Sequence, residues 1–157
     1  MSSPDPKQAN KYFIPSEEGP VRAAGFVPYK SNKKNKIFVL LGVKQDGYID
    51  VLGGKVEKID TSIKDTCNRE FYEEAEFAIK NPSYKKADMV YLPNCKYCSI
   101  LIPFKLNSKH IRYNVNNYEI VKIKWFNLKT LYDRPNLSVV LKSMEPFIKS
   151  WKLKEHC

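Results

Sequence analysis

Short runs of apolar residues, separated by turn-forming residues, recur along this chain and predict two groups of strands. The expected strands cover residues 21–29, 37–43, 48–52, 87–92, 97–106 and 120–126. The second run (IFVLLGV) is almost continuously apolar, which is typical of a strand buried on both faces. Asp46-Gly47 is a hairpin-turn sequence, and Pro93-Asn94 marks a second turn between paired strands. Pro103 indicates a sheet edge or a bulge at its position.

Helical spacing of apolar residues follows each group of strands. A first helix is expected to begin near Thr61 or Ser62, either of which can cap it, and to end before Asn81-Pro82. Its apolar stripe is Ile63, Cys67, Phe71 and Ala75. Residues 128–131 predict a short turn or helix, and a last helix spans 137–151, with Pro146 expected to kink or restart it. This order predicts an α+β fold in which helices cover a mixed sheet.

The length and the proline distribution indicate one domain with a tail. The 157 residues suit a single hydrophobic core. Residues 1–18 carry several prolines and predict an extended tail with one anchoring patch, Tyr12-Phe13-Ile14. Residues 19–157 are expected to form the folded domain.

The formal net charge of +10 comes almost entirely from lysine. Such a balance favours polyanionic partners such as nucleotides, RNA or inositol phosphates, although it is equally compatible with simple solubility. No apolar run approaches the roughly 20 residues of a membrane span, and the N-terminus lacks an apolar secretion core. The four cysteines are irregularly spaced. A cytoplasmic or nuclear protein is therefore expected, rather than a secreted one.

Three carboxylates stand close together on the first predicted helix. Glu70, Glu73 and Glu74 are spaced i, i+3 and i+4, so they share one arc of about 100°. Their mutual repulsion is relieved if a hard cation such as Mg²⁺ sits among them, behind a loop closed by Gly53-Gly54. The alternative is a solvated acidic face, which a concentrated acidic cluster in so basic a protein disfavours.

Gly54 through Phe77 resembles the signature of the Nudix hydrolases, G-x5-E-x7-R-E-U-x-E-E-x-G-U, in which U is bulky and apolar. The run from Arg69 to Ala75 (REFYEEA) fits the R-E-U-x-E-E-x core without a gap. The chain departs from the signature in three ways: Asp60 replaces glutamate, eight residues rather than seven separate Asp60 from Arg69, and Glu76 replaces glycine. The resemblance implies the Nudix α/β/α sandwich, a mixed sheet flanked by helices in a single domain.

The resemblance also implies roles for the matching residues. Glu73 and Glu74 would bind Mg²⁺ or Mn²⁺, and Glu70 would be a third ligand or the general base. The carbonyl of Gly53 would add an oxygen ligand. Arg69 would pair with Asp60 and hold the loop against the helix.

Several residues outside this core are further candidates. Glu119 lies shortly before Trp125-Phe126-Asn127-Leu128, where Nudix proteins often carry a glutamate that acts as a base or an extra ligand; it could equally be an ordinary loop residue. Lys55 and Arg22 could meet a substrate phosphate, against the alternatives of a solvated lysine and an ordinary surface pair. The candidates to stack on a base are Tyr12, Phe13, Phe26, Tyr29, Tyr113 and Tyr118.

Cys95 and Cys98 form a C-x2-C pair that could belong to a zinc site. Such a site needs two further ligands, and neither His110 nor His156-Cys157 has matching spacing. The pair is more typical of half-buried positions in a hairpin.

Together these features predict a metal-dependent pyrophosphohydrolase acting on a nucleotide-type substrate: a nucleoside diphosphate derivative, a dinucleoside polyphosphate or a capped RNA 5′ end. A diphosphoinositol polyphosphate is the alternative substrate. The alternative from another class is a Nudix-like module that binds RNA or nucleotide without turnover. The sequence leaves the oligomeric state open.

Overall fold

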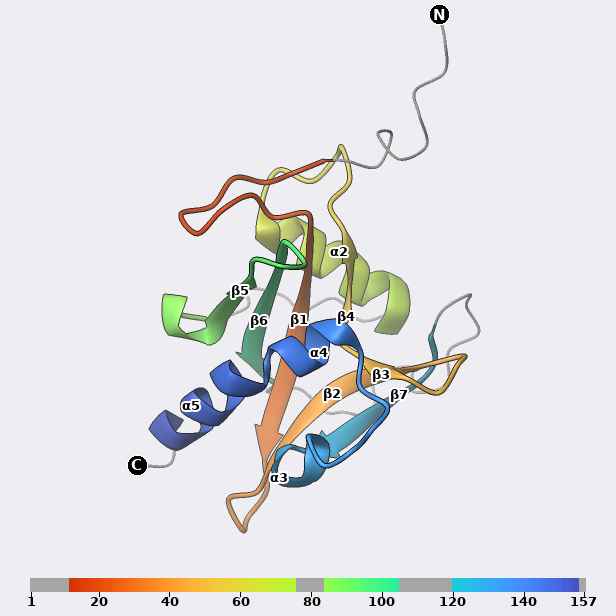
Figure 1. Ribbon diagram of the computed structural model, residues 1–157, viewed down its shortest axis with the longest axis vertical. Coiled ribbons are helices and arrows are strands. Elements are labelled where there is room, and N and C mark those ends of the chain that lie inside the picture. Colours follow the sequence, from red (N-terminus) through yellow and green to blue (C-terminus); the bar gives the residue numbers. More distant parts are fainter. Residues whose placement is uncertain (1–11, 76–83, 105–119, 156–157) are drawn as a thin grey trace, which may run out of the picture.

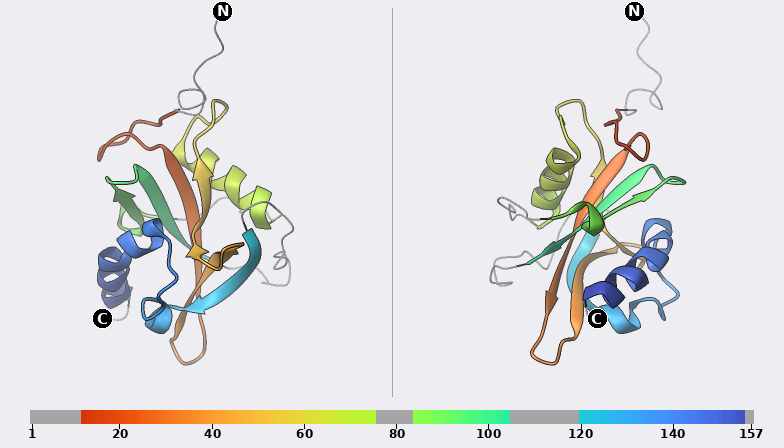
Figure 2. Two further views of the ribbon diagram at one scale, coloured as in Figure 1. Left: turned by 45° about the vertical axis from the view of Figure 1, so that its right-hand side comes forward. Right: turned by 90° about the vertical axis from the view of Figure 1, so that its left-hand side faces the viewer.

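A computed structural model describes residues 12–75, 84–104 and 120–155, with side chains described as far as Trp151. These residues form one mixed seven-stranded sheet with helices on both faces, as expected (Figures 1 and 2). The strands are β1 (Ala23–Ser31), β2 (Ile37–Lys44), β3 (Ile49–Asp50), β4 (Leu52–Lys55), β5 (Met89–Leu92), β6 (Tyr97–Pro103) and β7 (Ile120–Asn127). The helices are α2 (Ile63–Ala75), a 3-10 turn η1 (Lys86–Asp88), α3 (Leu128–Leu131), α4 (Val139–Ser143) and α5 (Glu145–Glu155).

Strand β1 is the centre of the sheet. Its first half pairs antiparallel with β4, its last residues pair antiparallel with β2, and it runs parallel to β6 along most of its length. Strand β5 pairs antiparallel with β6, and β7 and β3 both pair antiparallel with β2. The glycine-rich β4 is thereby fixed against the middle of the sheet.

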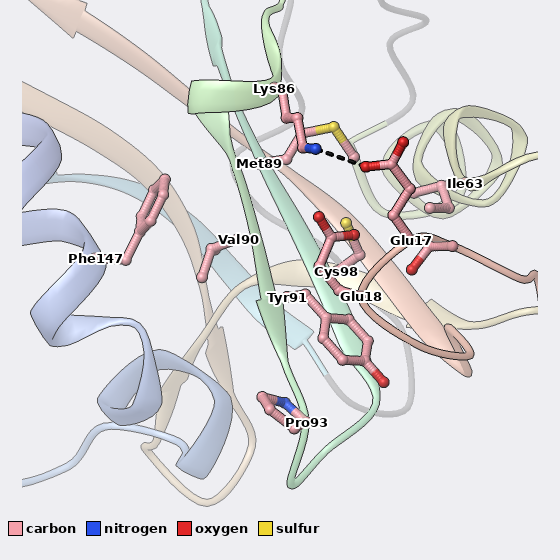
Figure 3. Close-up of a pocket in the computed structure, with 11 residues that line it drawn as sticks. Glu17, Glu18, Ile63, Lys86, Met89, Val90, Tyr91, Pro93, Cys98 and Phe147 are labelled. Carbon is pink, nitrogen blue, oxygen red and sulfur yellow. Dashed lines mark hydrogen bonds and ion pairs between the residues drawn. The ribbon is translucent and has the colours of Figure 1, made fainter.

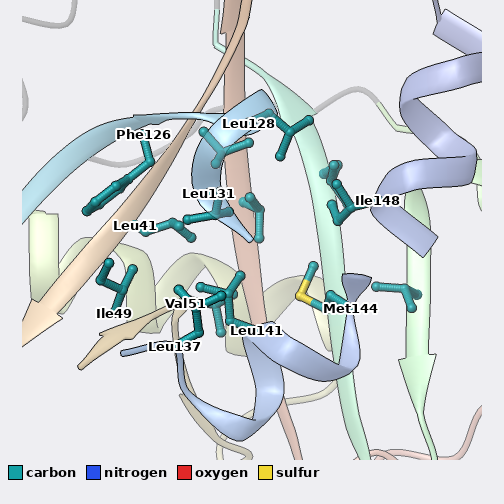
Figure 4. Close-up of a cluster of buried hydrophobic side chains, with 14 of the residues drawn as sticks. Leu41, Ile49, Val51, Phe126, Leu128, Leu131, Leu137, Leu141, Met144 and Ile148 are labelled. Atoms are coloured by element: carbon teal, nitrogen blue, oxygen red, sulfur yellow. The ribbon is translucent and has the colours of Figure 1, made fainter. Parts of the chain in front are cut away.

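The two faces of the sheet carry separate cores. On one face, Cys67, Phe71 and Ala75 of α2 pack on a cluster that includes Phe26 and Leu52. On the other face, side chains of α3, α4 and α5 cover the sheet, and Figure 4 shows them meeting Leu41 and Val51. The separation of α2 from the other helices by the sheet gives the three layers seen in Figure 2.

One sequence prediction is wrong in a way that matters for the site. Gly53-Gly54 was expected in a loop, but both glycines lie within β4 and pair with Gly25 and Ala24. The single strand expected over 48–52 is also divided, because β3 pairs with β2 while β4 crosses to β1. Asp50 lies at this division, where its Oδ1 accepts hydrogen bonds from the Val51 amide at 2.8 Å and the Ser138 hydroxyl at 2.6 Å.

The helix boundaries follow the expected signals. The Ser62 hydroxyl accepts a hydrogen bond from the Asp65 amide at 3.1 Å, so it satisfies one of the free amides at the start of α2. The last helix is divided at Met144, and Pro146 lies in the first turn of α5, where its missing amide breaks no hydrogen bond. The predicted end of α2 near Asn81 lies outside the described residues.

The remaining expectations concern the ends of elements. Pro103 is the last residue of β6 and lies beyond the residues that β5 pairs with, so its missing amide costs no hydrogen bond to β5. Ile14, within the expected anchoring patch, pairs with Val21 in an isolated antiparallel bridge. Among the described helices, none has the length and apolar character to cross a membrane.

Candidate active site

The guanidinium of Arg69 is the structural centre of the candidate site. Its Nε and Nη2 donate to the two oxygens of Asp60 at 3.2 and 2.9 Å, and Nη2 also donates to the Lys55 carbonyl at 2.8 Å. Arg69 therefore ties the end of β4 and the loop after it to the middle of α2. The pair expected between Arg69 and Asp60 is present, and the extra residue between them does not prevent a two-point contact.

Asp60 anchors this loop from the inside. Its Oδ2 accepts from the Glu57 amide and from the Thr66 hydroxyl, both at 2.8 Å, and its side chain is only 3% exposed. Burial alone would raise the pKa of the Asp60 carboxyl, but the hydrogen bonds from Arg69, Glu57 and Thr66 outweigh it and lower the pKa. The side chain is thus held as a carboxylate, and its hydrogen bonds to Arg69, together with the interaction of Arg69 with Glu70, raise the pKa of Arg69.

The third nitrogen of the guanidinium, Nη1, lies close to three more carboxylates. Nη1 of Arg69 lies 2.9 Å from Glu70, 3.4 Å from Glu57 and 3.5 Å from Glu73. Oxygen atoms from the loop and from two positions of α2 therefore converge on one point at the edge of the helix. Bidentate arginine is well suited to this arrangement because its planar fork can serve Asp60 and this cluster together.

Gly54 allows Glu70 to lie directly against β4. A Cβ atom at Gly54 would overlap the Glu70 carboxyl group, so a larger residue would displace this carboxyl from its position. Because Glu70 is largely buried here, its pKa is raised, and the Arg69 guanidinium offsets only part of this shift. The strand glycines thus bring a partly desolvated carboxylate into contact with the backbone of β4.

Gly53 has the same relation to Tyr97 on the opposite face of β4. A Cβ atom at Gly53 would overlap the Tyr97 hydroxyl, and one at Gly25 would also meet it. The tyrosine is 6% exposed, and its hydroxyl has no hydrogen-bond partner among the described residues. Burial is the main cause that raises the pKa of Tyr97 well above its usual value.

The expected metal ligands are near one another but are not arranged as a finished metal site. Within residues 12–75, 84–104 and 120–155, no three histidine, cysteine, aspartate or glutamate side chains are placed to hold a metal ion. Glu70 and Glu73 instead bond to Arg69, and Glu74 is buried, with 8% exposed. The donor set still fits a hard divalent cation, because the carboxylate oxygens already converge on a positive group beside the Gly53-Gly54 backbone.

The structure shows less about the roles of the remaining predicted site residues. Lys55 ends β4 with an exposed side chain, and Arg22 is half-buried beside it, where its amide donates to the Lys96 carbonyl at 2.7 Å. Phe26 is completely buried, so it is excluded as a residue that stacks on a base. Tyr29 packs edge-on against Trp151 with ring centroids 4.8 Å apart. Glu119, Tyr118 and Tyr113 lie outside the described residues.

Sequence reasoning missed two participants. Glu57 follows Gly53-Gly54 by three residues, but nothing in its spacing showed that its carboxylate would reach Arg69 across the loop. Tyr97 was assigned only to a strand, and its contact with Gly53 depends on the parallel pairing of β6 with β1. The unusual pair of adjacent glycines before an acidic helix was the one available signal.

A separate pocket of about 700 Å³ lies along β5 (Figure 3). It is lined by Glu17, Ile63, Lys86, Met89 and Cys98 among others, and it contains none of the residues expected to bind Mg²⁺ or to act as the base. Cys98 is buried, which raises the pKa of its thiol to about 12, and Cys95 is half-buried. Neither cysteine belongs to a cluster of metal-binding side chains among the described residues, and the further zinc ligands considered, His110 and His156-Cys157, lie outside them.

No family model matches this chain, and no curated protein matches it in sequence. Solved structures nevertheless match its fold over most of its length. RenU, a Nudix hydrolase from M. smegmatis, aligns with 91% of this chain and 95% of its own, with a TM-score of 0.65 and 15% identity. An Ap4A hydrolase of C. elegans, solved as a binary complex, aligns with 83% of this chain and 98% of its own (TM-score 0.57, 20% identity).

A third match is the Nudix domain of NrtR from Shewanella oneidensis, solved with ADP-ribose. It aligns with 97% of this chain and 92% of its own, with a TM-score of 0.58 and 14% identity. The chain therefore has the Nudix fold, which confirms the architecture implied by the resemblance at Gly54–Phe77.

Proposed function

We propose that this protein is a Nudix-type hydrolase that cleaves a phosphoanhydride bond in a nucleotide-type substrate. The observation that carries the proposal is the convergence of Glu57, Glu70 and Glu73 within 3.5 Å of one nitrogen of Arg69. Arg69 is itself fixed by Asp60 at the junction of β4 and α2. The fold is shared with an Ap4A hydrolase and with a domain that binds ADP-ribose, and both ligands contain nucleotide diphosphate linkages.

Glu70, Glu73 and Glu74, with the Gly53 carbonyl, would hold Mg²⁺ or Mn²⁺. When bound, such an ion shields phosphate charge and helps to activate the attacking water. Asp60 and Arg69 keep the loop fixed while Gly54 leaves space for Glu70 beside the strand. Lys55 and Arg22 flank the same end of β4 and would neutralise substrate phosphates. Glu119 stays the sequence-based candidate for the base, with Glu70 as its alternative.

The test is a panel of pyrophosphates incubated with Mg²⁺ or Mn²⁺: Ap4A, ADP-ribose, capped RNA and a diphosphoinositol polyphosphate. We expect turnover of at least one nucleotide substrate and a loss of about 100-fold or more in kcat for Glu74→Gln, as for other removed transition-state groups. The matched control is Glu145→Gln, which makes the same change on α5, across the sheet from α2. It should keep the wild-type rate.

Every other outcome contradicts a specific part of the proposed function. Wild-type turnover that survives Glu74→Gln contradicts the metal ligands assigned on α2. Exclusive turnover of the diphosphoinositol polyphosphate contradicts the nucleotide substrate class but not the hydrolase. Tight nucleotide or RNA binding without turnover contradicts the hydrolase and identifies a binding module. Glu119→Gln with an unchanged rate removes Glu119 from the mechanism.

A further inference from the structure

Charge is strongly segregated within this fold. Residues 19–45, which contain β1 and β2, include no aspartate or glutamate, and neither do residues 120–132, which contain β7 and α3. Lysines in these two segments are Lys30, Lys33, Lys34, Lys36, Lys44, Lys122, Lys124 and Lys129. In Figure 1 the β1–β2 turn lies at the end of the sheet opposite to the loop between β4 and α2. The basic end and the carboxylate site are therefore distinct regions.

The basic turn between β1 and β2 is ordered by its own hydrogen bonds. Asn32 Oδ1 accepts from the amides of Lys34 and Lys36, both at 3.0 Å, and the Asn32 amide donates to the Lys36 carbonyl at 3.0 Å. Asn35 adopts a φ of 59°, the left-handed conformation that asparagine tolerates well. These hydrogen bonds order the backbone of the turn, and the side chains of Lys33, Lys34 and Lys36 are exposed on it.

None of these three exposed lysines forms an ion pair with any carboxylate that the structure describes. Their positive field is consequently not cancelled locally. Like charges on a short turn repel one another, and a bound anion would relieve that repulsion. The turn is therefore suited to a ligand with several phosphates rather than to a single carboxylate.

An aromatic pocket lies directly beside this turn. It has a volume of about 450 Å³ and is lined by Lys30, Ser31, Asn32, Phe38 and Trp125. Lys30 Nζ lies 4.1 Å from the centroid of the Trp125 ring, and Phe104 packs edge-on against Trp125 at 5.6 Å. Phe38 and Trp125 are half-buried. The pocket combines aromatic surface, two polar side chains and a cation within one concave site.

We propose that the β1–β2 turn and this pocket form a binding surface for single-stranded nucleic acid. A base would stack in the pocket on Phe38 or, in place of the Lys30 ammonium, on Trp125. The adjoining phosphates would lie along Lys30, Lys33, Lys34 and Lys36. Stacking on aromatic rings beside a basic track is the usual way to bind single strands without sequence preference. A duplex hides its base faces, and an inositol phosphate or a lipid headgroup has no base to stack.

This surface goes beyond the proposed hydrolysis and does not depend on it. Binding requires neither a metal ion nor cleavage, so the test needs only the intact protein and an oligonucleotide. The proposed surface also assigns a role to several of the lysines. The net charge of +10 alone does not distinguish a binding surface from simple solubility.

Trp125 supplies a local reporter for the test. The chain has two tryptophans, and the other, Trp151, is 4% exposed and donates to Asp88 at 3.2 Å. A single-stranded oligonucleotide of roughly 12 nucleotides, within the usual site size, is titrated as RNA and as DNA without divalent metal. We expect quenching of tryptophan fluorescence in the wild type and its loss in Trp125→Phe. Binding without quenching would overturn the stacking.

The lysines are tested with two variants of equal charge. Lys33→Ala/Lys34→Ala/Lys36→Ala should weaken binding by on the order of tenfold or more and reduce the slope of log K against log salt by about 2, since each lost phosphate contact contributes about 0.7. Lys85→Ala/Lys142→Ala/Lys149→Ala removes three exposed lysines from other elements and should bind as the wild type.

Three results would overturn the proposal. Equal weakening in the two triple variants would show a general charge effect without a site. Equal affinity for duplex and single strand would exclude base stacking. Heparin or phosphoinositide vesicles that bind as tightly as the oligonucleotide would identify a general polyanion surface. Preference for RNA over DNA, or the reverse, decides which nucleic acid the surface serves, and either agrees with the proposal.

Discussion

Asp60 shows how one short side chain can fix a loop. Its carboxylate receives two hydrogen bonds from Arg69, one from the Glu57 amide and one from the Thr66 hydroxyl. The expected signature has the longer glutamate at this position. Aspartate reaches all four donors here because the loop after Lys55 returns to α2 and brings the backbone of residue 60 close to the helix.

Asp60→Asn should destabilise the protein by about 2 kcal/mol at neutral pH, because hydrogen bonds to a charged group are lost. The pKa of Asp60 is lowered in the folded state, so its contribution is present above the unfolded pKa of about 4 and is lost as pH falls through the folded value. The free energy of unfolding of both proteins is measured with denaturant from pH 7 downwards, over a range of about 4 pH units. The difference between the two proteins should shrink in acid. A difference that stays constant with pH would contradict this role.

At the scale of elements, the close approach of β4, β1 and β6 is the feature that sequence patterns did not reveal. Gly53 and Gly25 face each other across β1 and β4, and Tyr97 from β6 lies over both. The Tyr97 hydroxyl lies in space that side chains at Gly53 and Gly25 would otherwise occupy. This hydroxyl is buried and has no hydrogen-bond partner among the described residues, which lowers the stability of the folded state.

Tyr97→Phe should therefore raise the free energy of unfolding by about 1 kcal/mol, since it removes a buried unsatisfied hydroxyl and keeps the ring. The matched control is Tyr132→Phe, because the Tyr132 hydroxyl donates to the Leu141 carbonyl at 2.9 Å. That variant should lose stability by a similar amount. Chemical denaturation of both proteins provides the comparison, and a destabilised Tyr97→Phe would show that the hydroxyl has a stabilising role.

Local patterns predicted most elements because their signals are local. The buried run of β2, the Asp46-Gly47 turn, the Ser62 cap and the restart at Pro146 each depend on nearby residues. Long-range pairing was not predictable in the same way. Strand β3 pairs with β2, whereas β4, two residues later, pairs with β1. This pairing depends on which distant strand has a free edge and room for the glycines, and the residues near position 53 carry no signal for it.

At the scale of the whole molecule, two oppositely charged regions share one fold. The acidic region surrounds Arg69 between β4 and α2, and the lysine-rich region occupies the β1–β2 turn and β7. The sequence identified the carboxylates of α2, since their spacing is regular along a helix. It did not identify the arginine nitrogen as their meeting point or Glu57 as a member, because both depend on how the loop folds back.

Carboxylates can lie close together in this basic protein because a cation lies among them. Arg69 supplies the positive group within the cluster, and Asp60 fixes that group in position. A divalent ion would then have to compete for Glu70 and Glu73 with a guanidinium already beside them. The central claim is that these carboxylates nevertheless form a metal centre.

Manganese binding measured by electron paramagnetic resonance tests that claim directly, without any assumption about the substrate. The wild type should bind Mn²⁺, and Glu73→Gln, which changes a side chain that is 54% exposed, should weaken binding by about tenfold or more, as expected for a lost charged ligand. Glu145→Gln should bind as the wild type. Equal Mn²⁺ affinity in all three proteins, or no binding by the wild type, would contradict a metal centre on α2.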